Sequence, residues 1–305
     1  MLTKAIFDQF RLTNLERSLG VFGIHVYQAG EGDVELRFRA DDAVHVWSAS
    51  KTFTSAALGM CLGEGRLQLT DKVLNFFSDY ADIASPGSEL ISLHDLLQMR
   101  CGKDFDFFEV TDKDVINATD WAELFLRGQT TSTPGSRFYY ANVATYMIGR
   151  VIEAVTGLTT RNYLMPRLFD PLHILNPAWN TCPGGHSISA WGLQLVTSDL
   201  AKMGRLLLQG GRWDDAQLIP NEYVEAMHTD VVDSSNHFPD EESCAGYGYQ
   251  IWLCTSPGTW RLDGLYGQFS IIIPDKQAVV TTTSHNEKAA NDIIRAVFTD
   301  IEPKL

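Results

Sequence analysis

The sequence predicts a mixed α/β (α+β) fold, in which an antiparallel sheet flanked by helices is interrupted by an inserted helical lobe. Strand-like segments joined by short turns lie near both ends of the chain, whereas the segment between about residues 51 and 210 is mostly helical in pattern. With 305 residues, 45% of them hydrophobic, the chain is long enough to bury a sizeable core. A sheet built from both chain ends makes the middle segment a second lobe, and a cleft between two lobes is the default place for a site.

The predicted strands form two groups. Near the N-terminus, two strand-like stretches flank the turn G-E-G-D, which is the pattern of a β-hairpin. Near the C-terminus, four strand-like stretches follow one another, and the turn P-D-K separates the last two. An amphipathic helix of residues 287–299 closes the chain. The predicted strands cover residues 21–29, 34–39, 251–255, 259–263, 268–273 and 277–283.

Helices are predicted in the middle of the chain. Several of the helical segments have Ser, Thr or Asn before the first turn and Gly after the last, which is the usual capping asymmetry. We therefore expect a sheet domain formed by residues 1–60 and 205–305, a mostly helical lobe of residues 61–204, and an active site in the cleft between them. The predicted helices cover residues 51–65, 92–99, 119–127, 141–157 and 198–211.

Charge and hydropathy restrict the class of partner. The net charge of −14 and the pI near 4.9 argue against nucleic acid or an anionic membrane surface, because both would repel the chain. The first residues contain no apolar run of signal-peptide length, and no later segment approaches the length of a membrane span. We therefore expect a cytoplasmic protein that acts on a small molecule. The sequence carries no signal for the oligomeric state.

Cysteine and histidine spacing gives no sign of a metal site. The five cysteines are odd in number and widely spaced, without a C-x-x-C pair, so free buried thiols are expected. The eight histidines include no H-E-x-x-H and no other close ligand pair. We predict neither a metal nor another cofactor.

The stretch W-S-A-S-K-T-F, residues 47–53, places a serine one helical turn ahead of a lysine. If a helix begins here, Ser48 and Lys51 lie on one face, close enough for the amine to contact the hydroxyl. Taken alone, the pattern favours a simpler interpretation, in which Ser48 is a helix N-cap and Lys51 is a solvated side chain of the first turn.

A second local pattern changes this balance. Tyr140 is followed two residues later by Asn142, in P-G-S-R-F-Y-Y-A-N. A serine hydroxyl needs a base, and an ordinary lysine is protonated near neutral pH, so it cannot serve as one. Burial and a nearby tyrosine could lower the lysine pKa and share the proton. Serine, lysine, tyrosine and an amide together make a sufficient acyl-transfer apparatus without histidine.

With these two motifs, the chain resembles the serine β-lactamase and penicillin-binding-protein superfamily. More narrowly, it is similar to the branch with class C β-lactamases, D-aminopeptidases, 6-aminohexanoate oligomer hydrolases and family VIII carboxylesterases. That branch typically has S-x-S-K-T-F, found here from Ser48 to Phe53, and Y-x-N after P-G-x-x-F, found here from Pro134 to Asn142. The resemblance extends from about residue 20 to residue 300, and it implies a β-lactamase-like fold.

The resemblance also implies roles for these residues. Ser48 would be the acylated nucleophile and Lys51 the amine that polarises it. Tyr140 would be the base that takes the serine proton and returns it to the leaving group, and Asn142 would position the substrate. The backbone N–H of Ser48 would supply half of an oxyanion hole.

The third motif departs from the family pattern. Lactamases have K-T-G and relatives have H-x-G on the strand at the edge of the site, whereas this chain has L-D-G at residues 262–264. Aligned in this way, Gly264 matches the motif glycine, Leu265 would offer the second oxyanion N–H, and Tyr266 would line the pocket. Asp263 would repel the substrate carboxylate that K-T-G recognises. This lowers the odds of a β-lactamase and raises those of an esterase or amidase.

Two further residues, Trp191 and His45, are candidates for the site. Trp191 lies in the family-like segment A-W-G-L, so we expect it either at the substrate cleft or in the core. His45 precedes Ser48 by three residues, but no G-x-S-x-G elbow is present, so strand packing is the favoured interpretation.

The sequence therefore predicts a serine hydrolase that forms an acyl-enzyme and acts on a small ester or amide. A β-lactamase or D-amino-acid peptidase is one alternative. A non-catalytic ligand-binding module with a degenerate third motif is another. The substrate is not readable, because pocket shape depends on loops around residues 101–118 and 228–245.

Overall fold

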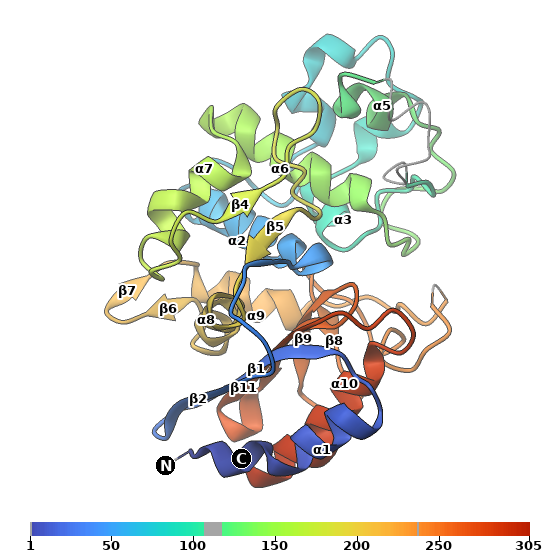
Figure 1. Cartoon of the computed structure of the whole chain (residues 1–305). Coiled ribbons are helices and arrows are strands. Elements are labelled where there is room, and N and C mark those ends of the chain that lie inside the picture. Colours follow the sequence, from blue (N-terminus) through green and yellow to red (C-terminus); the bar gives the residue numbers. More distant parts are fainter. Residues whose placement is uncertain (1, 107–117, 237) are drawn as a thin grey trace.

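The computed structural model describes residues 2–106, 118–236 and 238–305, and it confirms the mixed helical and antiparallel architecture (Figure 1). Within these residues the main sheet has six strands in the order β2-β1-β11-β10-β9-β8, and every neighbouring pair is antiparallel. Its strands are β1 Val21–Gln28, β2 Gly32–Arg37, β8 Trp252–Leu253, β9 Trp260–Gly264, β10 Gln268–Ile273 and β11 Ala278–Ser284. The two chain ends meet in this sheet, because β1 pairs with β11.

Helices cover both faces of the main sheet. Alternate residues of β10 belong to different hydrophobic clusters: Ile272 packs with the helical part, whereas Ile271 and Ile273 pack with the terminal helices. The period of two explains why β10 is apolar on every residue of the run I-I-I. The helices α1 Asp8–Glu16 and α10 Asn291–Ala296 lie together on one face, and α8 Thr197–Leu208 covers the other (Figure 1).

The remaining helices form most of the upper part of Figure 1, where α2 packs against α6. Helix α2 is buried along nearly its whole length, which its run of alanine, serine and threonine permits by keeping the side chains small. These helices are α2 Ser50–Gly63, α3 Leu93–Leu97, α5 Trp121–Arg127, α6 Asn142–Thr156 and α7 Thr160–Leu164, whereas α9 Asn221–Thr229 is drawn lower in Figure 1, next to α8.

Shorter elements complete the described chain. A three-stranded sheet has the order β3-β5-β4, and β6 pairs with β7 in a small hairpin. The short strands are β3 Val44–His45, β4 Ala178–Trp179, β5 Leu193–Leu195, β6 Arg212–Trp213 and β7 Ala216–Gln217. Single π-helical turns cover Met165–Phe169 and Val297–Ile301. Turns of 3-10 helix cover Lys4–Phe7, Trp47–Ala49, Val73–Phe76, Ser78–Tyr80, Ser88–Leu90, Pro274–Lys276 and Glu302–Lys304.

Several boundaries differ from those predicted. The helix expected over residues 287–299 begins at Asn291, and its end widens into a π-helical turn. The expected division into residues 1–60 with 205–305 and residues 61–204 stays a prediction, and its boundaries cut two helices. Helix α2 continues past residue 60, and α8 crosses residue 204 while it packs on β1, β10 and β11.

Candidate active site

Ser48 lies in the 3-10 turn Trp47–Ala49, directly before α2. Trp47 has a φ of 49°, in the left-handed region that is unfavourable for a bulky residue, and its N–H donates to Nδ1 of His45 at 2.9 Å. The last residue of β9 lies against this turn, since a Cβ at Gly264 would be 2.2 Å from the carbonyl oxygen of Val46. The glycine of the third motif therefore allows the sheet edge to approach the serine closely.

The N-cap role that the heptapeptide alone favoured is wrong. Helix α2 follows Ala49, and no side chain caps its N-terminus. The hydroxyl of Ser48 instead lies 2.9 Å from Nζ of Lys51, as the spacing of three residues on one face predicted.

Lys51 is almost completely buried, with 1% of its surface exposed. Its Nζ also lies 2.7 Å from Oδ1 of Asn142 and 3.0 Å from the carbonyl oxygen of Ala190. Burial lowers the pKa of Lys51 to about 7, although the carboxylates of Asp106 and Asp263 act in the opposite direction. A substantial fraction of the amine is therefore neutral at physiological pH, which a solvated lysine would not allow.

Tyr140 lies two residues before α6, and Asn142 is the first residue of this helix. The hydroxyl of Tyr140 hydrogen-bonds the side chain of Ser48, and its ring centre lies 5.0 Å from Nζ of Lys51. Burial raises the pKa of Tyr140 well above its ordinary value, so the phenol keeps its proton near neutral pH. The structure thus brings together the four residues that the two motifs singled out.

The carboxylate of Asp263 is paired. Its Oδ2 accepts a hydrogen bond from Nε of Arg261 at 2.8 Å, and this arginine is fully buried within the sheet. Arg261 also lies 3.4 Å from the carboxylate of Glu242. Burial raises the pKa of Asp263, and the arginine opposes that effect. Two carboxylates share one guanidinium here, so the edge of the site remains negative.

A cavity of about 270 Å³ opens beside Ser48 and Tyr140. Gly264, Leu265 and Tyr266 line it, and 52% of the surface of Leu265 is exposed. The Tyr266 ring packs edge-on to Trp47, with ring centres 5.3 Å apart. The other lining residues are Phe238, Asp240, Ser243, Trp252, Asp263, Phe269, Ala290 and Asn291.

Trp191 does not line this cavity. Its ring lies beside His45, with centres 5.8 Å apart, and its carbonyl oxygen accepts from Nε1 of Trp179 at 3.0 Å. His45 itself belongs to β3, in accordance with the strand interpretation. A substrate-binding role for Trp191 stays a prediction.

Several groups at the site could not be predicted from the sequence. Nothing in the sequence marks the carbonyl of Ala190 or the side chain of Asp106 as neighbours of Lys51 and Asn142. The segment 228–245, expected to shape the pocket, contributes Phe238, Asp240 and Ser243 to its lining. Of the other expected loop, 101–118, residues 107–117 lie outside the described residues.

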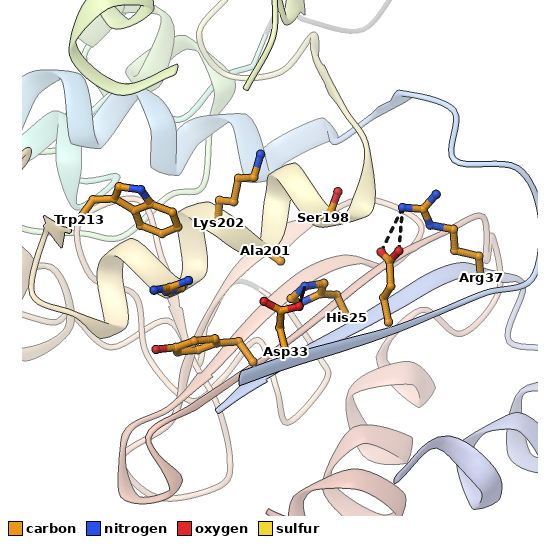
Figure 2. A pocket seen from close by; sticks show the side chains of 10 residues that line it. His25, Asp33, Arg37, Ser198, Ala201, Lys202 and Trp213 are labelled. Atoms are coloured by element: carbon orange, nitrogen blue, oxygen red, sulfur yellow. Dashed lines mark hydrogen bonds and ion pairs between the residues drawn. The ribbon is translucent and has the colours of Figure 1, made fainter. Parts of the chain in front are cut away.

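A second cavity, of about 350 Å³, lies between β1, β2 and α8. Figure 2 shows His25 and Asp33 on the strands facing Lys202 and Trp213, with Arg37 near one end. Arg37 is paired with Glu35 at 3.0 Å. None of the predicted catalytic residues lines this cavity, so we assign the chemistry to the cavity at Ser48.

The described part of the chain carries neither a metal-binding cluster nor a membrane-spanning helix. There, His, Cys, Asp and Glu side chains nowhere gather in groups of three that could hold a metal ion. All five cysteines are free, and Cys244 is the one that is not fully buried. Over the same residues, no helix is both long and apolar enough to cross a membrane. The absence of cofactors and the cytoplasmic location stay predictions.

The chain is similar to known proteins over most of its length. The model of the family described as Beta-lactamase matches residues 20–299. The 6-aminohexanoate-dimer hydrolase of Paenarthrobacter ureafaciens is 22% identical over 269 residues, which cover 81% of this chain and 67% of that protein. Protein flp of Staphylococcus aureus is 24% identical over 176 residues, covering 55% of this chain and 35% of that protein. The chain thus spans about two thirds or less of the length of these relatives.

Solved structures share the fold. A D-stereospecific amidohydrolase from Streptomyces sp. superposes with a TM-score of 0.74 at 20% identity, over 98% of this chain and 99% of that one. A penicillin-binding protein from Bacillus halodurans gives a TM-score of 0.72 at 20% identity, over 94% and 98% of the two chains.

Proposed function

Because this chain belongs to the β-lactamase family, whose model matches residues 20–299, we propose that it is a serine hydrolase that forms an acyl-enzyme at Ser48. The observation that carries the proposal is the contact of 2.9 Å between the Ser48 hydroxyl and the buried amine of Lys51. A nucleophile within hydrogen-bonding distance of a base with a lowered pKa is the arrangement that activates serine.

Lys51 is better suited than Tyr140 to take the first proton. A neutral amine has two N–H donors and one lone pair. The oxygens of Asn142 and Ala190 accept the two N–H groups, which leaves the lone pair for the Ser48 hydroxyl. Tyr140, whose pKa is raised, holds its own proton near neutral pH. In this proposal Lys51 therefore takes over from Tyr140 the role of first base, whereas Tyr140 keeps the role, implied by the resemblance, of protonating the leaving group.

The proton of the Ser48 hydroxyl is transferred first to Lys51 and then, through Tyr140, to the leaving group. As Oγ of Ser48 bonds to the acyl carbon, its proton passes to Nζ of Lys51. When the bond to the leaving group breaks, the Tyr140 hydroxyl protonates the leaving group and regains a proton from the Lys51 ammonium. In the second half, water attacks the acyl carbon, loses a proton by the same route, and Ser48 regains its hydroxyl as the acid departs.

The cavity favours substrates without a carboxylate near the scissile bond. Asp240 and Asp263 line it, and the lysine of K-T-G is absent, so an anionic group would be repelled there. We therefore propose a small ester or amide as substrate. Amides are supported by two relatives, whose names give a 6-aminohexanoate-dimer hydrolase and a D-stereospecific amidohydrolase. A lactam comes third, because penicillins carry a carboxylate.

Hydrolysis of three chromogenic substrates tests this proposal: p-nitrophenyl butyrate, a D-amino-acid p-nitroanilide and a chromogenic cephalosporin. Ser48→Ala should abolish turnover of every substrate that the wild type hydrolyses. Ser50→Ala is the matched control, because Ser50 lies in the same motif and its hydroxyl accepts from the N–H of Leu193 at 3.3 Å. The control should keep most of the activity. Turnover by Ser48→Ala at the wild-type rate would show that Ser48 is not the nucleophile.

A further inference from the structure

We propose that Asp106 is a positioning residue, which holds the side-chain amide of Asn142 in the one orientation that leaves the lone pair of Lys51 for Ser48. The inference rests on the proposed function, and it deepens it by adding a residue that no sequence motif marks. It concerns the protein groups around Lys51 and does not depend on the identity of the substrate.

The contacts form a chain of three side chains. Oδ2 of Asp106 accepts from Nδ2 of Asn142 at 2.7 Å and from the backbone N–H of Asn142 at 3.1 Å. Oδ1 of the same amide accepts from Nζ of Lys51 at 2.7 Å. The carboxylate therefore fixes both the side chain of Asn142 and the first N–H of α6, which has no partner within the helix.

Hydrogen-bond chemistry allows only one orientation of the Asn142 side-chain amide between Asp106 and Lys51. An ionised carboxylate only accepts hydrogen bonds, so the NH₂ end of the Asn142 amide must face Asp106. The carbonyl end then faces Lys51 and can accept an N–H from it. If the amide turned over, its NH₂ group would face Lys51 and donate to the amine lone pair. That donation would compete with the Ser48 hydroxyl, and the base would be occupied.

Two residues just before Asp106 anchor the segment that carries it. Lys103 is fully buried and its Nζ donates to the hydroxyls of Ser85 at 2.9 Å and Ser88 at 3.0 Å, and also to the carbonyl of Gly128. Asp104 forms an ion pair with Arg137. These contacts hold residues 103–106 against the helical part, so that Asp106 meets Asn142 at a defined position.

Asp106 also contributes charge to the site. Two carboxylates, Asp106 and Asp263, act on the Lys51 amine and raise its pKa, whereas burial lowers it. The other groups around the amine, namely Ser48, Asn142, the Ala190 carbonyl and the protonated Tyr140, are neutral. Loss of the Asp106 charge should therefore lower the pKa of Lys51 and make the amine neutral at lower pH.

Two substitutions separate position from charge. Asp106→Asn removes the charge and keeps an acceptor oxygen, which the backbone N–H of Asn142 holds in place, whereas Asp106→Ala removes both. Asp104→Asn is the matched control, because it removes the same charge from the same segment, at a residue paired with Arg137 and not with Asn142. The readout is the rate of Ser48 labelling by a fluorophosphonate between pH 5 and 9, followed by intact mass, which requires an activated serine and no substrate.

The proposal makes four expectations. In Asp106→Asn the acidic limb of the curve of labelling rate against pH should move down by about one pH unit. The maximal labelling rate should stay within about threefold of the wild type. In Asp106→Ala the limb should move likewise and the maximal rate fall about 10- to 100-fold. Asp104→Asn should match the wild type in both respects. Because Asp106 acts through Asn142, the double variant Asp106→Ala/Asn142→Ala should label no more slowly than Asn142→Ala alone.

Three results would overturn the proposal. They are a wild-type rate and pH profile in Asp106→Ala, equal effects of Asp104→Asn and Asp106→Asn, or additive losses in the double variant. Absence of labelling in the wild type would be a failure of the proposed function itself, and the role of Asp106 would fall with it. Labelling of the wild type with an unaffected Asp106→Ala would overturn the role of Asp106 alone.

Discussion

Replacement of Lys51 by methionine should change how the stability of the protein depends on pH. The side chain of methionine has a similar length and no charge, so Lys51→Met removes one titrating group from a buried position. Burial lowers the pKa of Lys51 from the ordinary lysine value of 10.5 to about 7 in the folded protein. Between pH 7 and pH 10.5, the unfolded chain therefore binds a proton on this lysine that the folded chain does not bind.

The sign and size of the change in the free energy of unfolding follow from this difference in bound protons. Where the unfolded state binds more protons, the free energy of unfolding rises with pH, here by about 1.4 kcal/mol per pH unit for one group. Below pH 7 both states hold the proton and the full cost of burying the ammonium is present. From pH 7 to pH 9 the wild type should therefore gain about 2 kcal/mol that Lys51→Met does not gain. The three lost hydrogen bonds change the absolute difference and not its slope.

Urea unfolding of both proteins at pH 7, 8 and 9 measures the effect. Other groups titrate in this range, including Lys103, whose pKa is lowered to about 8 by burial, but they are common to both proteins and cancel in the difference. We expect the stability difference between wild type and Lys51→Met to change steadily in favour of the wild type as pH rises. A difference that stays constant within about 0.5 kcal/mol would mean that Lys51 is an ordinary ammonium, and the proposed base would be lost.

Three further predictions concern the site. The value of kcat/KM should rise with pH through about 7, because neutral Lys51 is the active form, and Lys51→Arg should be inactive, since a guanidinium keeps its proton; a pH-independent profile would contradict this. Tyr140→Phe should lower kcat by about 10²- to 10⁴-fold while leaving the fold intact by circular dichroism, and an unchanged kcat would remove Tyr140 from proton transfer. Gly264→Ala should lower the free energy of unfolding by about 1–3 kcal/mol and slow labelling of Ser48, because the new methyl group meets the Val46 carbonyl; unchanged stability would contradict the close approach of β9.

The main sheet and the long helices were predictable because their signals are local. The runs that became β10 and β11 are apolar and are separated by P-D-K, and α6 is followed directly by Gly157, whose φ of 72° suits a helix C-terminus. The short strands β4 and β5 were missed, because their pairing is a tertiary contact without a repeating pattern. Helix α1 also escaped prediction.

The same holds for the site: residues in local motifs were predictable from the sequence, and partners from distant segments were not. Ser48 and Lys51 are three residues apart, so helical geometry alone predicted their contact. The third motif placed Gly264, Leu265 and Tyr266 at the site, and all three line the cavity beside Ser48, whereas the oxyanion role of the Leu265 N–H stays a prediction. The partners that set the state of Lys51 come from distant segments: the Ala190 carbonyl is 139 residues away, and it is a backbone atom that any residue would supply. Asp106 sits in a segment without periodicity, so only the folded chain reveals that it binds Asn142.

The central claim is that Ser48 becomes covalently acylated, and intact mass after incubation with a fluorophosphonate tests it most directly. The same measurement with a penicillin tests the proposed preference against anionic substrates. We expect one fluorophosphonate adduct on the wild type, none on Ser48→Ala, and no lasting penicillin adduct on either. Labelling by both reagents would restore a penicillin-recognising site. Failure of the fluorophosphonate to label the wild type would contradict the account and favour a non-catalytic binding module.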